Sequence, residues 1–587
     1  MSVDRLCRVL YLDLTRKTHE VRERPEVFEP GLGGTHAAIR LLEEECPSGA
    51  DPLGPENAVV FAVGPLTCLF PLASKTVAMF KSPLTGNLGE SHAGGRSAVA
   101  IRHAGYGAIV VRGASDLPIY LVVGGSRVQF RDASAIWGMT RASTSAKIIR
   151  HRESGSGLRT IMRIGRAGER LVRYASVTTE TYRHFGRLGL GAVLGSKKLK
   201  AIQVSGRASI AVTDPKQYQA VYDEIHTAAV ESELMKKYHD LGTAVNVSHL
   251  LEMGGLPARN LRETRYEGAE ALSGANLAAN YLGRRLACAH CPVACIHIAA
   301  LRQPYEEEPY FYKTSMISYD YELIYALGTM LGISDAFGYL RLTEAVEDCG
   351  LDAMTTGVVL AWATEALERG LITTAETLDA KLAWGDWQAY AQAVHFIVEQ
   401  PNEFYRTLAQ GVTAAAERYG GQDFALALNR VEMAGYHTGP GAYANYLTGA
   451  RHSHLDSAGY TLDQKADPQR TPERLAAELL KEEQWRQILS SLVVCFFARG
   501  IYKPDLVCRA LAVAGVSLTE DDLGRLGRGI LAAKHRLKQR EGFSWTEYAL
   551  PKRIFETPAL GQPISEEALR QTVAEFARLA AEAQGAG

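Results

Sequence analysis

The spacing of hydrophobic and polar positions changes near residue 205. Before this point, short β-branched and apolar runs such as 58–63 and 108–112 alternate with Gly, Pro and Asp. This pattern is typical of strands joined by turns. Residues 119–130 predict a hairpin whose turn is Gly124-Gly125-Ser126. The first 205 residues are therefore expected to be rich in β-strands.

Beyond residue 206, apolar residues recur at helical spacing. The predicted helices are 218–241, 335–349, 358–369 and 387–400. From about residue 415 the chain opens with loops rich in Gly, Tyr and His and then becomes helical again. We expect an α+β protein with a β-rich domain (1–205) and two mainly helical domains (206–415 and 416–587). Domains without flexible linkers share buried interfaces, where large cofactors commonly bind.

Composition excludes several classes of protein. Hydrophobic residues make up 47% of the 587 residues, charged residues 22%, and the formal net charge is −1. These values suit a globular protein and give no sign of a nucleic-acid or membrane partner. No apolar stretch has the length of a membrane span or the form of a signal peptide. Nine cysteines without a regular framework favour a reducing compartment, so a cytoplasmic location is expected.

The most specific motif is the triplet Cys288, Cys291 and Cys295. If this run is helical, the three sulfurs lie on one face. Three interpretations are open: buried core cysteines, a zinc site that includes His290 or His297, or an iron–sulfur cluster. The cluster is favoured because zinc ribbons show a second CxxC pair, which this chain lacks. A cluster of four iron atoms then predicts a fourth cysteine far away in the sequence.

Two glycine-rich segments, 81–95 and 186–200, could expose backbone to a ligand, with Arg187 near a phosphate. The second resembles GxGxxG, but no acidic residue follows at the spacing of a dinucleotide-binding fold. A tight turn with solvated lysines is the alternative.

Glu322 precedes an apolar segment. Burial there would raise the pKa of Glu322, which would suit a general base; alternatively, the carboxylate would favour a helix N-terminus. His454 lies in a loop, where exposure to solvent is commoner than catalysis.

Several separated motifs also occur together in a fixed order. They are 63–67 (VGPLT), 81–86 (KSPLTG), 93–95 (AGG), 167–169 (AGE), 189–202, the cysteine triplet, 350–352 (GLD) and 550–553 (LPKR). In this order they resemble the tungsten- or molybdenum-dependent aldehyde:ferredoxin oxidoreductases. The resemblance spans essentially the whole chain.

The resemblance implies that the first domain binds pterin and that two largely helical domains follow. It implies tungsten or molybdenum held by two pyranopterin dithiolenes, a neighbouring [4Fe–4S] cluster, and Mg²⁺ bridging the pterin phosphates. Cys495 then becomes the fourth cluster ligand, in preference to Cys508 or Cys349. The implied cofactor contacts are Lys75, His92, Gly94, Gly95, Arg187 and Leu188 from the first domain and Glu347, Leu351 and Asp352 from the second. Asp352 would accept hydrogen bonds from a pterin amine, and Glu322 and His454 align with the family's active-site glutamate and histidine.

This chain departs from the family's usual residues at several positions. The family commonly has arginine at Lys75, asparagine at His92, and aspartate at both Glu347 and Ser490. Arg341 and Glu344 replace the Glu-x-x-His motif that binds a bridging iron in some members, so no bridging iron is expected.

The leading functional hypothesis is oxidation of an aldehyde to a carboxylic acid. Glu322 would activate water or take the proton, and His454 would hydrogen-bond the developing oxyanion. Electrons would leave through the cluster to a ferredoxin or an iron–sulfur partner subunit. One alternative is low-potential reduction of an aromatic acyl-CoA or another non-aldehyde substrate. Another is a non-catalytic scaffold that binds zinc or a cluster. A homo-oligomer or hetero-oligomer is expected.

Overall fold

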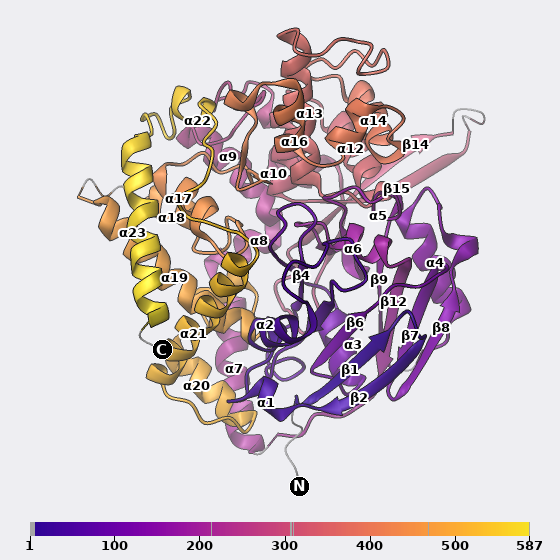
Figure 1. Cartoon of the computed structure of the whole chain (residues 1–587), viewed down its shortest axis with the longest axis vertical. Coiled ribbons are helices and arrows are strands. Elements are labelled where there is room, and N and C mark those ends of the chain that lie inside the picture. The colour runs from indigo at the N-terminus through magenta and orange to yellow at the C-terminus, as the bar shows by residue number, and fades with distance from the viewer. Residues whose placement is uncertain are drawn as a thin grey trace.

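The computed structural model describes residues 6–155, 157–212, 214–305, 308, 310–465, 467 and 469–585. Two six-stranded sheets form the N-terminal part, and the helices of the rest of the chain pack beside and above them (Figure 1). The chain is therefore an α+β protein, as its sequence predicts.

The first sheet has the strand order β2-β1-β6-β3-β4-β5. β1 and β6 pair in parallel and the other neighbours are antiparallel. The strands are β1 (Arg8–Asp13), β2 (Thr18–Glu23), β3 (Val59–Ala62), β4 (Thr76–Lys81), β5 (Leu88–Ala93) and β6 (Ala108–Arg112). Every residue of β3 and β4 is buried, which explains the apolar composition of β3 and of the centre of β4, residues 77–80. The runs at 58–63 and 108–112 thus form strands, as predicted.

The second sheet has the order β11-β10-β9-β12-β7-β8. The predicted hairpin is confirmed, because β7 and β8 pair with Gly124 opposite Arg127. Gly125 in its two-residue turn has a φ of +61°, which glycine adopts without strain. The strands are β7 (Ile119–Gly124), β8 (Arg127–Asp132), β9 (Leu158–Ile164), β10 (Val177–Thr178), β11 (His184–Phe185) and β12 (Leu199–Gly206). The helices around both sheets are α1 (Pro25–Phe28), α2 (Gly34–Glu45), α3 (Ser97–His103), α4 (Ala142–Arg152), α5 (Arg166–Glu169) and α6 (Leu190–Ser196).

The middle of the chain is mainly helical. Its helices are α7 (Pro215–Glu231), α8 (Glu233–Leu241), α9 (Val245–Met253), α10 (Gly274–Asn280), α11 (Tyr321–Leu327), α12 (Ala336–Cys349), α13 (Ala353–Glu368), α14 (Trp387–Glu399), α15 (Glu403–Leu408) and α16 (Val412–Tyr419). The helix expected over 218–241 is two helices, because Ser232 leaves helical geometry and caps α8 by accepting a hydrogen bond from the Met235 N–H. The other three predicted helices correspond to α12, α13 and α14.

The middle also holds an antiparallel sheet that helical periodicity did not predict. Its strands are β13 (Leu282–Leu286), β14 (Ile296–Pro304) and β15 (Tyr312–Tyr319). β13 exposes Gly283, Arg284 and Arg285, so it lacks the alternation of a half-buried strand.

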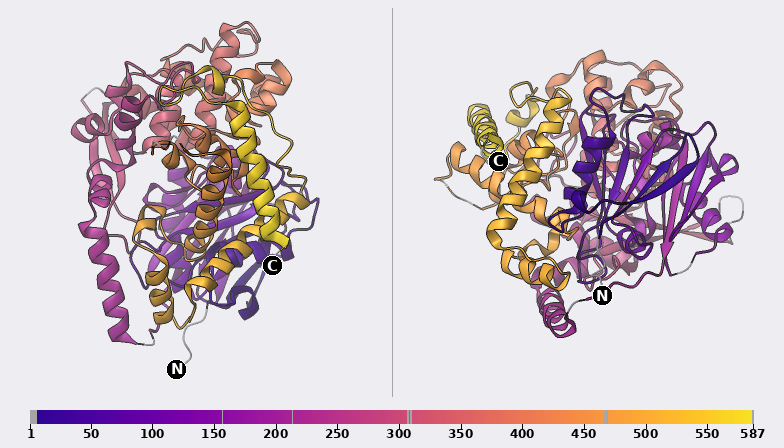
Figure 2. Two further views of the ribbon diagram at one scale, coloured as in Figure 1. Left: turned by 90° about the vertical axis from the view of Figure 1, so that its left-hand side faces the viewer. Right: turned by 60° about the horizontal axis from the view of Figure 1, so that its bottom comes forward.

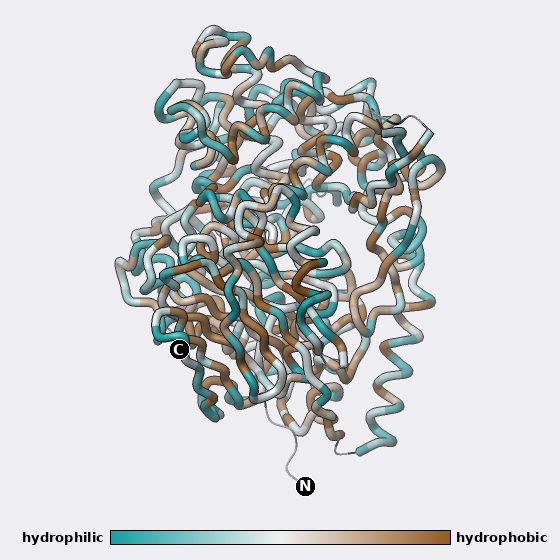
Figure 3. Tube along the Cα trace, turned by 90° about the vertical axis from the view of Figure 1, so that its right-hand side faces the viewer, coloured by the Kyte–Doolittle hydropathy of each residue, from teal (hydrophilic) through white to brown (hydrophobic). Residues whose placement is uncertain are grey.

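The C-terminal part begins with a short hairpin and continues as helices. The elements are β16 (Ala427–Leu428), β17 (Val431–Glu432), α17 (Pro440–Thr448), α18 (Gly459–Asp463), α19 (Pro472–Ser491), α20 (Pro504–Val513), α21 (Glu520–Arg540), α22 (Arg553–Glu556) and α23 (Glu566–Gly585). Figure 2 shows α19, α21 and α23 packed along the side of the sheet-bearing part, and the tube in Figure 3 is brown along the buried strands.

One hydrophobic cluster joins all three parts of the chain. It contains Leu72 from the first part, Val221 and Val293 from the middle, and Leu492 and Tyr502 from the last. The half-buried residues packed against it include three of the cysteines that the sequence singled out, Cys291, Cys295 and Cys495. Packing of this cluster therefore places the cysteines at the junction of the three parts.

No single helix among the described residues is long and apolar enough to cross a membrane. One helix pair, 321–331 with 336–349, passes on length and composition but is bent by 113°.

Candidate metal centre and active site

The cysteine triplet lies in the loop between β13 and β14. Residues 288–295 form no helix in the structure, which corrects the helical placement considered above. His290 and Ala294 adopt left-handed backbone conformations, with φ of +57° and +52°. Two left-handed residues within eight cannot belong to an α-helix, so the chain folds back on itself. Cys291, Cys295 and Cys495 are each partly or largely buried there.

Backbone hydrogen bonds bring Cys495 to this loop. Its N–H donates to the Leu72 carbonyl at 2.8 Å, and the Leu72 N–H donates to the His290 carbonyl at 3.1 Å. Beside them, the Lys75 N–H donates to the Val493 carbonyl at 3.1 Å. The segment at 72–75 thus lies between the two cysteine-bearing segments and holds both.

The four sulfurs act on one another electrostatically. Burial, and next the sulfurs of Cys495 and Cys288, raise the pKa of Cys295 to about 12, while Arg183 and Lys75 act in the opposite direction. Burial and the neighbouring sulfurs also raise the pKa of Cys291. Neutral thiols are favoured while no cation balances them, and thiolates need bound metal. In the described part of the chain, no three Cys, His, Asp or Glu side chains lie close enough to share a single metal ion.

The glycine pair at the end of β5 lies against the cysteine loop. A Cβ on Gly94 would meet the Cys288 sulfur at 2.9 Å and the Lys75 Nζ at 3.7 Å. The carbonyl of Gly95 accepts a hydrogen bond from the Ala289 N–H at 2.8 Å. Only glycine at position 94 therefore allows this close approach. The structure therefore places three of the predicted cofactor contacts close to one another: Lys75, Gly94 and Gly95.

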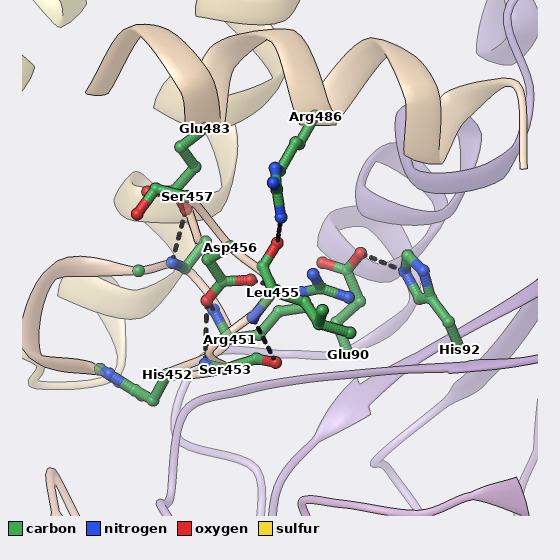
Figure 4. A network of polar contacts seen from close by, with 12 residues as sticks. Glu90, His92, Arg451, His452, Ser453, Leu455, Asp456, Ser457, Glu483 and Arg486 are labelled. Atoms are coloured by element: carbon green, nitrogen blue, oxygen red, sulfur yellow. Dashed lines mark hydrogen bonds and ion pairs between the residues drawn. The ribbon is translucent and has the colours of Figure 1, made fainter. Parts of the chain in front are cut away.

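His92 lies two residues earlier on β5 and forms a 2.7 Å contact between its Nε2 and Glu90 Oε1 (Figure 4). Thr35 and Lys534 also bind the Glu90 carboxylate, at 2.8 and 2.5 Å. Burial, and next the charge of Arg451, lower the pKa of His92 to about 4, although Glu90 opposes them. A neutral His92 that donates from Nε2 keeps Nδ1 as an acceptor.

Arg187 and Leu188 lie on the loop after β11. Leu188 has a φ of +69°, and its carbonyl accepts a hydrogen bond from the Ser82 hydroxyl at 2.8 Å. Arg187 donates to the Glu432 carbonyl at 2.6 Å, and its Nε lies 3.5 Å from Asp352 Oδ2. The two glycine-rich segments singled out in the sequence are therefore in contact, and Arg187 bridges to the helical part.

Asp352 is the N-cap of α13. Its carboxylate accepts hydrogen bonds from the Met354 N–H at 3.2 Å and from the Thr355 hydroxyl at 2.5 Å. Leu351 is buried and forms a β-bridge with Ala175 of the first part. The Gly-Leu-Asp motif thus starts a helix and also fixes the contact between the sheets and the helices.

Glu347 lies in the last turn of α12. Burial, and next the charges of Asp348 and Asp320, raise its pKa to about 8, although Arg183 and Arg163 oppose them. Its Oε1 is buried without a hydrogen-bond partner among the described residues. A carboxylic acid in this state is ready to donate to or accept from a bound group.

Other buried polar atoms near these residues also have no hydrogen-bond partner within the described chain, although Arg187 Nε makes the 3.5 Å ion pair with Asp352. They are Arg183 Nε and Arg187 Nε and Nη1. Guanidinium nitrogens without hydrogen-bond partners fit phosphate oxygens, the Glu347 oxygen without a partner fits a ring N–H, and four sulfurs that act on one another electrostatically fit a cluster. The residues present therefore fit a phosphorylated heterocyclic cofactor beside an iron–sulfur cluster.

Glu322 and His454 meet at one oxygen. Glu322, in the first turn of α11, has its Oε1 3.3 Å from His454 Nε2 and accepts a 2.8 Å hydrogen bond from the Tyr436 hydroxyl. The His454 ring stacks on Tyr436, and Tyr436 also stacks on Tyr460 at a centroid distance of 4.2 Å. Burial raises the pKa of Glu322, but His454 and then Tyr436 outweigh it, so the net pKa is lowered. The raised pKa expected from burial is therefore wrong.

The loop that contains His454 is held by hydrogen bonds within the loop and by a hydrogen bond from α19. Asp456 accepts hydrogen bonds from the Arg451 and Ser453 N–H groups, each at 3.0 Å, and from Arg451 Nε at 2.6 Å. Arg486 of α19 donates to the Leu455 carbonyl at 2.6 Å (Figure 4). His454 is therefore buried, contrary to the exposure that is common for loop histidines, and its Nδ1 has no hydrogen-bond partner in the described chain.

Sequence reasoning missed four residues at the site: Arg183, Asp320, Glu432 and Tyr436. Asp320 caps α11 and is half-buried; desolvation, and next the charge of Glu322, raise its pKa to about 6. Only the cap of Asp320 had a local signal, because an Asp before an apolar helical run is an N-cap pattern. The other three reach the site through tertiary packing.

Comparison with known proteins agrees with this architecture. The sequence model of "Aldehyde ferredoxin oxidoreductase, N-terminal domain" matches residues 9–206, and that of "Aldehyde ferredoxin oxidoreductase, domains 2 & 3" matches residues 220–581. The chain is similar to the tungsten-containing aldehyde ferredoxin oxidoreductases of Thermococcus kodakarensis (32% identity, 93% of this chain and 91% of that protein) and Pyrococcus furiosus (32%, 91% and 88%). It is also 32% identical to the WOR-like subunit of an aliphatic sulfonate oxidoreductase of P. furiosus, over 70% of this chain and 66% of that protein.

A solved structure has the same fold. It is described as "Active site complex BamBC of Benzoyl Coenzyme A reductase in complex with 1,5 Dienoyl-CoA", with a TM-score of 0.82, 21% identity and coverage of 99% of this chain and 95% of that chain. The matches to the family models identify the chain as an oxidoreductase. It belongs to the aldehyde ferredoxin oxidoreductase family.

Proposed function

We propose that this protein oxidises an aldehyde with water to a carboxylic acid and releases two electrons and two protons. Its cofactors are a tungsten pterin and a [4Fe–4S] cluster. The tungsten pterin supplies a two-electron acceptor when bound. The observation that carries the proposal is the pairing of Glu322 with His454 at 3.3 Å.

Glu322 is the base in this proposal. Its lowered pKa keeps the carboxylate ionised at neutral pH, so it can take a proton from water or from the substrate hydrate. Tyr436 and His454 hold the carboxylate in a single orientation. His454 is the hydrogen-bond donor for the developing oxyanion, a role that contributes roughly 3–4 kcal/mol in other enzymes.

Electrons leave through the cluster in this proposal. Cys288, Cys291, Cys295 and Cys495 would hold the cluster, and Arg183 and Lys75 would favour its negative charge. The buried guanidinium groups of Arg183 and Arg187 would bind pterin phosphates, together with Mg²⁺, and Asp352 and Glu347 would bind ring nitrogens. The remaining pterin contacts would come from Lys75, His92, Gly94, Gly95, Leu188 and Leu351.

We also propose a cytoplasmic location, a ferredoxin or iron–sulfur subunit as the electron acceptor, an oligomeric assembly, and domain boundaries at 205/206 and 415/416.

The test is metal analysis followed by an activity panel. The holoenzyme produced with tungstate or molybdate should contain tungsten, or molybdenum in its place, and about four irons per chain. It should reduce benzyl viologen with simple aldehydes. Activity with benzoyl-CoA and none with aldehydes would replace this proposal with aromatic reduction. Zinc as the only metal would contradict both and favour a scaffold.

A further inference from the structure

A surface groove is lined by residues that follow Cys495 in the chain. It has a volume of about 610 Å³, and the segment from Phe497 to Lys503 forms one wall. The end of α7 and the start of α8 form the opposite wall, where Leu234 is 44% exposed next to Met235. Figure 2 shows α7 running along the outside of the molecule.

This first wall is directly connected to the cysteine cluster. Phe497 follows Cys495 by two residues, and its ring stacks on Tyr238 at a centroid distance of 4.4 Å. Tyr502, between two lining residues, is buried against the same hydrophobic cluster, and the Cys291 sulfur adds to burial in raising its pKa. A short stretch of protein therefore separates the groove from two of the four sulfurs.

The groove combines an apolar floor with a positive rim. Arg499 and the exposed Lys503 have no carboxylate partner within the part of the chain that the structure describes. Arg509, by contrast, is ion-paired with Glu224 at 2.6 Å and with Asp505 at 3.0 Å, so the groove lining has three cationic side chains and two carboxylates. The unpaired charges thus lie on the wall that leads to Cys495.

We propose that this groove is the docking site of the electron acceptor, a small ferredoxin-type protein with an acidic surface around its own cluster. The inference rests on the proposed function, because only an enzyme that sends electrons out through its cluster needs such a partner. The apolar floor supplies contact area, while Arg499 and Lys503 steer and orient the acidic partner.

Gly500 allows the groove to be blocked without disturbing the fold. A Cβ at this position meets no atom within 4 Å, and its φ lies outside the left-handed region. Gly500→Trp therefore fills the groove, and Gly500→Ala is its matched control. Lys503→Glu reverses a rim charge, and Arg127→Glu makes the same change on exposed β8, in the second sheet.

The experiment measures binding and turnover separately with a recombinant acidic [4Fe–4S] ferredoxin. We expect Lys503→Glu and Gly500→Trp to raise the ferredoxin Kd for the holoenzyme, and the ferredoxin KM, by roughly tenfold. Aldehyde oxidation with benzyl viologen should be unchanged, because a small dye needs no docking surface. Both controls should match the wild type.

Wild-type ferredoxin Kd in both variants would overturn the docking site, as would an absence of ferredoxin binding to the wild-type holoenzyme. The Kd is measured without turnover. A holoenzyme that binds ferredoxin in the groove but oxidises no aldehyde would therefore contradict the proposed function and still support the docking site.

Discussion

Glu322 Oε1 lies 3.3 Å from His454 Nε2. The two residues come from the N-terminus of α11 and from a loop more than a hundred residues later, so their meeting depends on the packing of both helical parts. A shared proton between carboxylate and imidazole is a common basis for acid–base chemistry.

Replacing either partner should reduce turnover strongly. We expect Glu322→Gln to lower kcat by about 10²–10⁴-fold, the usual contribution of a general base, and His454→Ala by about 10²–10³-fold. Tyr436→Phe keeps the stacked ring and removes one hydrogen bond, so it should lose less. Steady-state rates with benzyl viologen measure all three. Full activity in Glu322→Gln or His454→Ala would exclude that residue from the chemistry.

The pH profile should report the lowered pKa of Glu322. A base with a lowered pKa stays ionised as the pH falls, so the acid limb of kcat/KM should lie below the ordinary carboxyl range. In Tyr436→Phe one of the interactions that lower this pKa is lost, and the limb should move to higher pH. An acid limb near neutrality in the wild type would show that another group is the base.

Cys495 should be the fourth cluster ligand. Cys495→Ser should lower the iron content and change the EPR spectrum of the reduced cluster, because one thiolate ligand is lost. Cys508→Ser and Cys349→Ser are matched controls, since neither cysteine is among the sulfurs that act on Cys295. Unchanged iron and spectrum in Cys495→Ser, with a loss in either control, would reassign the ligand.

Glu347 should make the apoprotein less stable at high pH. Its folded pKa of about 8 lies above the unfolded value, so the folded state binds more protons between about pH 4.3 and 8. The free energy of unfolding from this group therefore falls as pH rises, by up to about 1.4 kcal/mol per unit. Glu347→Gln stays neutral and should flatten the decline. Urea unfolding of both apoproteins at pH 6 and 8 tests this, and equal slopes would contradict it.

Asp456 should position His454 without touching substrate. Asp456→Asn leaves Arg451, which is buried, with a weaker partner, and breaking such a pair costs about 3–5 kcal/mol. The loop should loosen, so kcat should fall more than KM changes and the unfolding free energy should drop. Asp116→Asn, at an exposed ion pair, is the control for stability and activity. A stable and fully active Asp456→Asn enzyme would remove the positioning role.

Apolar spacing predicted the buried strands and several helices because their side chains pack into cores. It failed for β13, whose exposed arginines leave no alternating pattern, and it missed the break at Ser232, since a serine within an amphipathic run has no distinct period. Cysteine spacing could not distinguish a helix from a loop, because both bring sulfurs three or four residues apart to one place.

The site was only partly predictable for a similar reason. The cysteine triplet is local in sequence and could be recognised by its spacing. No sequence pattern around Arg183 or Tyr436 identifies them as site residues. Arg183 acts through a buried guanidinium nitrogen, and Tyr436 acts through a ring that stacks on His454. Glu322 could be singled out by position, but the direction of its pKa depends on His454, which comes from a different part of the chain.

Cys295 and Cys495 are 200 residues apart in the chain, yet their sulfurs interact electrostatically in the fold. A cluster bound by both cysteines would close a very large loop of the polypeptide. Its insertion would restrict the unfolded chain as a cross-link does. Iron supply would then govern maturation as well as electron flow. In an iron-starved cell, the newly made polypeptide would lack the bond that ties its last helices to its middle, and it would be more readily degraded.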